Sequence, residues 1–223
     1  MTDSFVSAPR PTWRLVPSRF PPIGLFDTVA TAADAAVVME LAGWTNDRLV
    51  AERIDRLPRD QWVYGRQNAS IVMASFLHVA PDGMRFNGPD LGAWYASASI
   101  VTAAAEVGHH LRREAVARSV KVMQRTYRSY SAILTGDYLD ICAKQAEQPD
   151  AYASDSYDGG QALGEKVRAS GASGLVYDSL RHQGGRNVVG YRPASITEVL
   201  QTDHFEISIE IGSRRIDVRK LSA

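Results

Sequence analysis

The spacing of apolar and polar residues along the chain predicts several strands separated by helices. Residues 12–16 are rich in β-branched and aromatic side chains, and Pro17 closes the run, which favours a strand. Residues 123–134 alternate aromatic or aliphatic side chains with polar ones, which is the period of a long, half-exposed strand. Shorter apolar runs predict further strands at residues 92–96, 138–142, 174–178, 187–191, 205–211 and 215–219.

Helical spacing of apolar residues predicts a second set of elements. The first helix follows Asp27 or Thr28, either of which can cap its amino end, and it closes at Gly43. Further helices are expected at residues 70–79, 97–114 and 161–170.

The order of these elements indicates the fold class. Strands and helices do not alternate strictly, as they do in a doubly wound parallel sheet. We therefore expect an α+β fold with a twisted, mainly antiparallel or mixed sheet that is flanked by helices.

Composition along the chain predicts one folded domain with an appendage at each end. Residues 1–11 are polar and contain prolines, so a flexible N-terminal arm is expected there. The domain itself is expected over residues 12–200, and residues 201–223 are expected to form a C-terminal strand extension packed on it. Inside the domain, the prolines of residues 19–22 favour an extended or turned link, and the charged residues 46–59 are expected on the surface.

The charge balance argues against several classes of function. The chain has 25 basic and 25 acidic residues, so it has no broad cationic field that would attract nucleic acid or an anionic membrane. No secretory signal and no apolar segment of membrane-spanning length is evident. Cys142 is the only cysteine, and its apolar neighbours indicate a small core residue rather than a nucleophile. We expect a cytoplasmic protein that binds neither nucleic acid nor membrane directly.

Three residues form the most informative group in the chain. Arg85 follows a glycine turn, Tyr95 ends a short apolar strand, and Glu106 is the only charged side chain between Ala96 and Val107. An isolated carboxylate among apolar residues must find a partner or lose its charge. An arginine and a tyrosine from the preceding strands are plausible partners, and the group is suited to an anionic, ring-bearing ligand.

Each residue also has a plainer interpretation when it is taken alone. Arg85 can be an ordinary solvated arginine, and Arg14 can be a charge on the face of an early strand. Tyr95 can be a core aromatic residue with its hydroxyl satisfied. Glu106 can be a helix-surface acid that pairs with Arg113 or His110. Periodicity alone leaves these alternatives open.

Other kinds of chemistry have weaker support in the sequence. His109 and His110 are adjacent, so on a helix their side chains diverge by about 100° and cannot share one metal ion. No phosphate-binding loop and no nucleophile elbow is present, and we expect no metal site. Residues 179–186 follow a predicted core strand, which is a common place for ligand contacts.

Several stretches together resemble the RES domain family, the toxin half of a bacterial toxin–antitoxin system that is named for characteristic Arg, Glu and Ser residues. The resemblance runs from about Trp13 to Pro193, most of the chain. The motifs that carry it are residues 13–22, 85–87, 94–96, 105–106, 156–164 and 174–182.

The resemblance implies a fold like that of ADP-ribosyltransferase toxins, with NAD⁺ as substrate and no cofactor. It implies that Glu106, Arg85 and Tyr95 are catalytic, that Arg14 also binds NAD⁺, and that Ser179 is the family serine at the NAD⁺ site. Members of this family remove NAD⁺ by hydrolysis or phosphorolysis, or transfer ADP-ribose to a protein. An antitoxin with an Xre-type helix-turn-helix blocks the site until the toxin is released.

Two departures from the family pattern keep alternatives open. Met84 stands where a second glycine usually precedes the arginine, and Gly159-Gly160 stands where related sequences often have a serine. If that serine is the functional one, Ser179 is not, and activity is reduced. Water, phosphate or a protein side chain can be the acceptor, and a catalytically silent module that binds a nucleotide or a partner is a further alternative.

Overall fold

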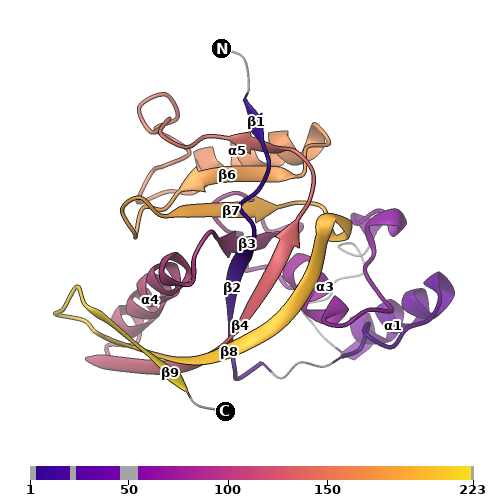
Figure 1. The fold of residues 1–223 in the computed structure, drawn as a ribbon, viewed down its shortest axis with the longest axis horizontal. Coiled ribbons are helices and arrows are strands. Elements are labelled where there is room, and N and C mark those ends of the chain that lie inside the picture. The colour runs from indigo at the N-terminus through magenta and orange to yellow at the C-terminus, as the bar shows by residue number, and fades with distance from the viewer. Residues whose placement is uncertain (1–3, 21–23, 46–54, 222–223) are drawn as a thin grey trace.

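A computed structural model describes residues 4–20, 24–45 and 55–221 of the chain. In this part of the chain, nine strands form one sheet in the order β1-β5-β6-β7-β3-β2-β4-β8-β9 (Figure 1). Neighbouring strands are antiparallel except β5 and β6, which are parallel. The strands are β1 (Phe5–Val6), β2 (Thr12–Pro17), β3 (Trp94–Ser97), β4 (Val122–Leu134), β5 (Tyr138–Asp140), β6 (Gly174–Asp178), β7 (Arg186–Gly190), β8 (Ile196–Glu210) and β9 (Ile216–Leu221).

Helices cover different parts of this sheet. In Figure 1, α1 and α3 lie on one side of the central strands, α4 lies on the other, and α5 covers the half formed by β6 and β7. The fold is therefore α+β with a mixed, mostly antiparallel sheet, as the order of elements predicts. The helices are α1 (Ala32–Thr45), α3 (Ala69–Leu77), α4 (Ile100–Ala117) and α5 (Asp158–Ala169), with 3₁₀ turns η1 (Arg59–Gln61) and η2 (Pro193–Ser195).

Each helical layer buries its own apolar cluster against the sheet. Phe76 of α3 packs with Trp94 and with side chains of β4 and β8. Leu111 of α4 packs on Tyr127 of β4. Val167 of α5 belongs to the cluster formed with β5, β6 and β7. Burial of these apolar faces supplies the main driving force for folding.

The long strand β8 connects the centre of the sheet to its C-terminal edge. It pairs with β4 along most of its length, with register shifts near Arg128 and Ser131, and its last residues also pair with β9. The β8–β9 ribbon curves beneath α4 (Figure 1). Gly108 of α4 permits the contact, because an added Cβ would lie 2.6 Å from Cδ1 of Ile216. No helix in the described ranges is both long enough and apolar enough to cross a membrane.

The first helix begins later than the sequence predicts. Thr31 caps it, because the Asp34 backbone N–H donates to Thr31 Oγ1 over 3.1 Å. Asp27, the expected cap, instead accepts a bond from the Ser70 backbone N–H at 2.8 Å. Its carboxylate therefore holds the amino end of α3, a pairing across 43 residues that local sequence does not reveal.

The N-terminal segment differs from a flexible arm where it is described. Phe5 and Val6 form β1 and pair with Leu139 and Tyr138, and Ala8 is buried. The expected arm at residues 1–11, link at residues 19–22 and charged surface segment at residues 46–59 are each described only in part. Residues 1–3, 21–23 and 46–54 lie outside the described residues.

Candidate functional site

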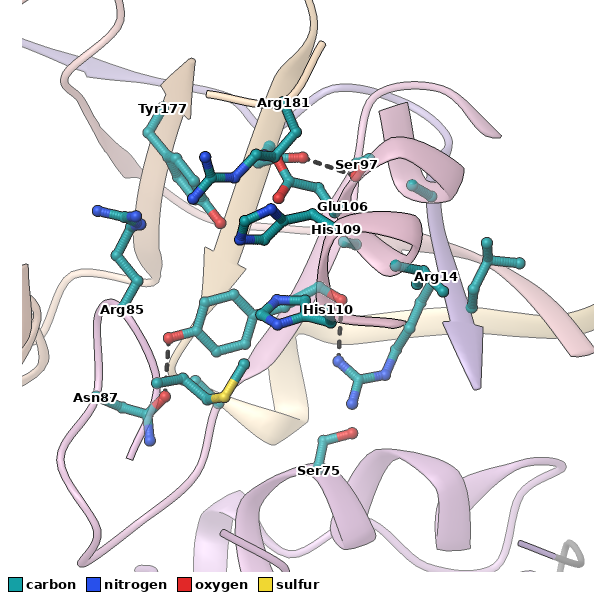
Figure 2. A pocket seen from close by; sticks show the side chains of 18 of the residues that line it. Arg14, Ser75, Arg85, Asn87, Ser97, Glu106, His109, His110, Tyr177 and Arg181 are labelled. Carbon is teal, nitrogen blue, oxygen red and sulfur yellow. Dashed lines mark hydrogen bonds between the residues drawn. The ribbon is translucent and has the colours of Figure 1, made fainter. Parts of the chain in front are cut away.

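A cavity of about 330 Å³ opens between β2, β3, α4 and the turn before β3. Arg14, Arg85, Tyr95 and Glu106 all line it. Figure 2 labels Arg14, Arg85 and Glu106 among the side chains around the cavity. These four side chains come from four different segments, so their meeting depends on the order of strands in the sheet. A second hollow of about 450 Å³ adjoins the cavity, and His109 and Tyr157 line both.

Arg14 extends from β2 towards the cavity. Its Nη1 donates to the Tyr95 carbonyl oxygen over 2.9 Å, and the guanidinium lies 4.9 Å from the centre of the Trp94 ring. Burial lowers the pKa of Arg14 to about 10, so the group is still charged at neutral pH. Its buried Nε has no hydrogen-bond partner within the described ranges. A charged, incompletely satisfied guanidinium in a poorly solvated place attracts an anion.

Arg85 lies in a tight turn at residues 83–88. Gly83 adopts a φ of +70°, and the Met84 backbone N–H donates to the Asn87 carbonyl over 2.8 Å. The Arg85 Nη1 donates to the carbonyl oxygens of Ala151 and Ala153 over 3.2 and 2.7 Å. Carbonyl oxygens fix the direction of the guanidinium without neutralising its charge, which leaves that charge available to a ligand.

Tyr95 links β3 to this turn through its hydroxyl. The hydroxyl donates to Asn87 Oδ1 over 2.8 Å and accepts from the Phe86 backbone N–H over 3.0 Å. Burial raises the pKa of Tyr95 well above its usual value, so the phenol is neutral at physiological pH. The two bonds hold the ring at the wall of the cavity.

Glu106 is supplied by α4, which starts where Ser99 Oγ accepts the Thr102 backbone N–H over 3.2 Å. The carboxylate is not unpartnered. Its Oε1 accepts a bond from Ser179 Oγ and another from Asn187 Nδ2, each 2.7 Å long. Both bonds end on the same oxygen, and the carboxylate borders the cavity.

Ser179 lies behind Glu106 rather than on the cavity wall. Its buried hydroxyl donates to Glu106 and accepts the backbone N–H groups of Arg181 and His182 over 3.1 and 2.9 Å. The serine therefore orders the loop at residues 179–186 and holds the carboxylate. A contact between Ser179 and NAD⁺ stays a prediction.

The same loop contributes a further cation, Arg181, which the sequence did not predict as a site residue. Arg181 lines the cavity near Glu106 and His109 (Figure 2). The only indication in the sequence was the position of its loop after a core strand. Tyr177, at the end of that strand, packs edge-on against Phe86 with ring centroids 4.6 Å apart. Burial, aided by the negative charge of Glu106, raises the pKa of Tyr177.

His109 and His110 both line the cavity, with ring centroids 5.6 Å apart. Loss of bulk water lowers the pKa of His109 to about 4, and the nearby Arg181 guanidinium adds to the shift. Loss of water also lowers the pKa of His110, against a smaller opposing effect of Glu106. The sequence hint was their spacing of three and four residues after Glu106, which places them near the same helix face.

The glycines at the start of α5 have a packing role. A Cβ at Gly160 would lie 2.3 Å from the Arg85 carbonyl oxygen, and one at Gly164 would lie 2.0 Å from the Phe86 carbonyl oxygen. A Cβ at Gly159 would lie 2.4 Å from the Asp150 side chain. Neighbouring atoms of Arg85 and Asp150 therefore occupy the space that a larger side chain at Gly160 or Gly159 would need.

Together, these observations define an α+β protein with a cavity lined by arginines, aromatic residues and the hydrogen-bonded carboxylate of Glu106. The RES domain family model matches residues 52–210, which is more than half of the chain. The protein belongs to the RES domain family.

One solved structure provides a further comparison. A chain in the crystal structure of the M. tuberculosis MbcT–MbcA toxin–antitoxin complex is 23% identical, with a TM-score of 0.41. The match covers 55% of this chain and 73% of that one. None of the curated proteins matches this chain significantly.

Proposed function

We propose that the protein is a toxin-type enzyme that cleaves the bond between nicotinamide and ribose in NAD⁺. The transfer of the ADP-ribosyl group to water is hydrolysis, and its transfer to inorganic phosphate is phosphorolysis. The observation that carries the proposal is the convergence of Arg14, Arg85, Tyr95 and Glu106 on one cavity. Family membership supports the same substrate, because the RES resemblance implies NAD⁺.

Glu106 would act on the ribose. Breakage of the glycosidic bond develops positive charge on the ribose carbon, as in the cleavage of other glycosides. A carboxylate that is already oriented stabilises this charge without reorganisation during the reaction. Ser179 and Asn187 both bind Oε1, so Oε2 is the oxygen suited to face the ribose hydroxyls.

The two arginines would hold the pyrophosphate. A guanidinium presents paired N–H groups that match phosphate oxygens, and binding to an anion is strengthened where water is scarce. Arg85 keeps its charge available because its observed hydrogen-bond acceptors are carbonyl oxygens. Arg14 has a buried Nε that a ligand oxygen can satisfy.

Aromatic walls would receive the nicotinamide ring. Tyr95 is held in place by two hydroxyl bonds, so its ring offers a fixed face for stacking. Nicotinamide leaves as a neutral molecule and requires no general acid. One essential carboxylate is therefore sufficient, whereas most glycosidases use two.

We infer further that the activity inhibits growth until an antitoxin binds, and that the protein acts in the cytoplasm. The RES resemblance implies a partner with an Xre-type helix-turn-helix. Such a partner would occlude the cavity and so prevent NAD⁺ from entering. The charge balance offers no reason to expect direct binding of nucleic acid or membrane.

The direct test measures nicotinamide release from NAD⁺ by the purified protein, with and without inorganic phosphate. Wild-type protein is expected to release nicotinamide together with ADP-ribose or its 1-phosphate, and Glu106→Gln is expected to lose at least about 100-fold in kcat. Glu114→Gln is the matched control. It makes the same change on the same helix, where Glu114 pairs with Arg125 outside the cavity.

Other outcomes of this experiment distinguish the alternatives. A mass increase on a target protein would indicate ADP-ribosyl transfer. No release of nicotinamide by the wild type, and equal growth of cells expressing wild type or Glu106→Gln, would instead indicate a silent binding module.

A further inference from the structure

Ser97 and Asn187 form a buried polar pair directly behind Glu106. Their exposed fractions are 4% and 2%. Ser97 Oγ donates to Asn187 Oδ1 over 2.7 Å, and Asn187 Nδ2 donates to Glu106 Oε1 over 2.7 Å. A buried polar group without a hydrogen-bond partner destabilises the folded state, so this series of hydrogen bonds has one favoured donor-to-acceptor direction.

The sheet determines the position of this pair. Ser97 of β3 is the direct antiparallel partner of Asn187 of β7. Tyr95 lies two residues before Ser97, so both side chains project to the same face of the strand, and both border the cavity. The pair therefore has no freedom to move along the strands, and the sheet holds it against the helix that carries Glu106.

The Glu106 carboxylate determines which way the Asn187 amide faces. A carboxamide has a donor end and an acceptor end, and the two can be exchanged by rotation of the side chain. In the reversed state, Asn187 Oδ1 would face Glu106 Oε1 at hydrogen-bond distance, and two acceptors would repel. Glu106 therefore favours the state in which the N–H faces it, and the Ser97 hydroxyl, which can donate or accept, then donates to Asn187 Oδ1.

We propose that Asn187 is the positioning residue for Glu106 and that Ser97 supports it by donating to its amide oxygen. This inference rests on the proposed function, because it assigns a role in the cleavage of the nicotinamide–ribose bond. Asn187 exchanges no proton and forms no covalent bond. It immobilises one carboxylate oxygen so that the other is held in a fixed direction towards the ribose.

The main test is Asn187→Asp, which keeps the size of the side chain but replaces the donor with a second carboxylate. Repulsion displaces Glu106, and kcat for nicotinamide release is expected to fall about 100-fold, since small errors in the position of a reacting group have effects of this size. The KM for NAD⁺ is expected to stay within about twofold, because the arginines are unchanged. The control Gln201→Glu makes the same change on β8, away from the cavity, and is expected to behave like wild type.

The pH profile separates positioning from a general loss of structure. Two neighbouring carboxylates share a proton more readily than isolated ones do. In the Asn187→Asp variant, the introduced carboxyl can donate to Glu106 again once it is protonated. The activity of this variant relative to wild type is therefore expected to rise as the pH falls from 8 to about 5.5. A flat ratio across this range would overturn the proposal.

Substitution of Ser97 tests the second part. Ser97→Ala leaves the Asn187 amide oxygen without its donor, so the amide is held less firmly against Glu106. The kcat is expected to fall about tenfold, since the loss of one neutral hydrogen bond is worth about 1 kcal/mol. Ser97→Thr keeps the hydroxyl and is expected to recover most of this loss. Equal activity of Ser97→Ala and wild type would contradict the role of Ser97.

A stability measurement tests the contact without relying on turnover. Glu106→Gln removes the repulsion that Asn187→Asp introduces, so the double variant is expected to have a higher urea midpoint than Asn187→Asp alone. Additive midpoints would overturn the positioning role. If the wild type releases no nicotinamide, the proposed function fails, and this cycle still decides whether Asn187 orients Glu106.

Discussion

At the scale of single residues, the site combines charges that lack a full set of partners with groups that are firmly held. Among the described residues, Arg14 Nε finds no partner, and Arg85 donates its hydrogen bonds to carbonyl oxygens. Glu106 and Tyr95, in contrast, are each fixed by two hydrogen bonds. Firmly held groups beside incompletely satisfied cations suit a site that must bind an anion and orient it.

Tyr95→Phe isolates the contribution of one hydroxyl. The ring stays, but the Phe86 N–H loses its acceptor and the Asn87 side chain loses its donor. Unfolding free energy measured in urea is expected to fall by about 1 kcal/mol. The KM for NAD⁺ is expected to rise because the turn that carries Arg85 loosens. An unchanged KM with reduced stability would show that the hydroxyl serves the fold alone.

His109 is expected to make stability depend on pH. Its pKa is lowered from 6.5 to about 4, so the folded state favours the neutral ring. The stabilisation is complete above about pH 6.5 and is lost as the pH falls through 4, because the unfolded chain binds the proton more readily. Thermal unfolding between pH 4 and 7 should show a shallower slope for His109→Gln than for wild type. Parallel slopes for the two proteins would exclude this origin.

At the scale of elements, α5 acts as the support for the turn that carries Arg85. Its glycines permit backbone contact at two positions, Gly160 on Arg85 and Gly164 on Phe86. The side chain of Gln161 adds bonds to the carbonyls of Asp82 and Met84 over 2.8 and 3.1 Å. The helix therefore influences the position of a cation that belongs to another segment.

Gly160→Ala tests this support. The added methyl would overlap with the Arg85 carbonyl, so α5 must shift, at an expected cost of about 1–3 kcal/mol in unfolding free energy. The KM for NAD⁺ is expected to rise with it. Gly88→Ala is the control, because it lies in the same turn and an added Cβ there meets nothing within 4 Å. Similar losses in both variants would indicate a general sensitivity of the turn.

The elements also show which boundaries can be predicted from local sequence. The strand at residues 123–134 and the helix that carries Glu106 were predicted within a few residues, because their periodicity extends over many positions. The predicted start of α1, capped by Asp27 or Thr28, was wrong. Asp27 has the residue type of a cap, but it binds the amino end of α3, and only the folded chain brings the two together.

At the scale of the whole molecule, the sheet order assembles the site. Strand β2 lies between β3 and β4, which places Arg14 beside Tyr95 although 81 residues separate them. The β8–β9 ribbon then closes the other side of α4, the helix that supplies Glu106 (Figure 1). The C-terminal strands therefore support the helix that carries Glu106 without contacting the cavity.

Ile216→Ala tests this distant support. Its side chain covers Gly108 and is partly buried, so a loss of roughly 1–2 kcal/mol in unfolding free energy is expected, about half the effect of a fully buried site. The kcat at 20 °C is expected to stay near the wild-type value while the melting temperature falls. Val218→Ala, at an exposed position of the same strand, is the control and should change neither quantity. A large loss of kcat in Ile216→Ala would instead indicate that the ribbon sets the geometry of the site.

The sequence by itself determined the types of the main elements, the α+β class and the group of Arg85, Tyr95 and Glu106. These follow from short-range periodicity and from Glu106 being the only charged side chain between Ala96 and Val107. Only the tertiary structure decided which groups satisfy that carboxylate: Asn187 lies 81 residues away and Ser179 lies 73 away. Local patterns report the burial of each residue, whereas hydrogen-bond partners across strands depend on the register and order of the complete sheet.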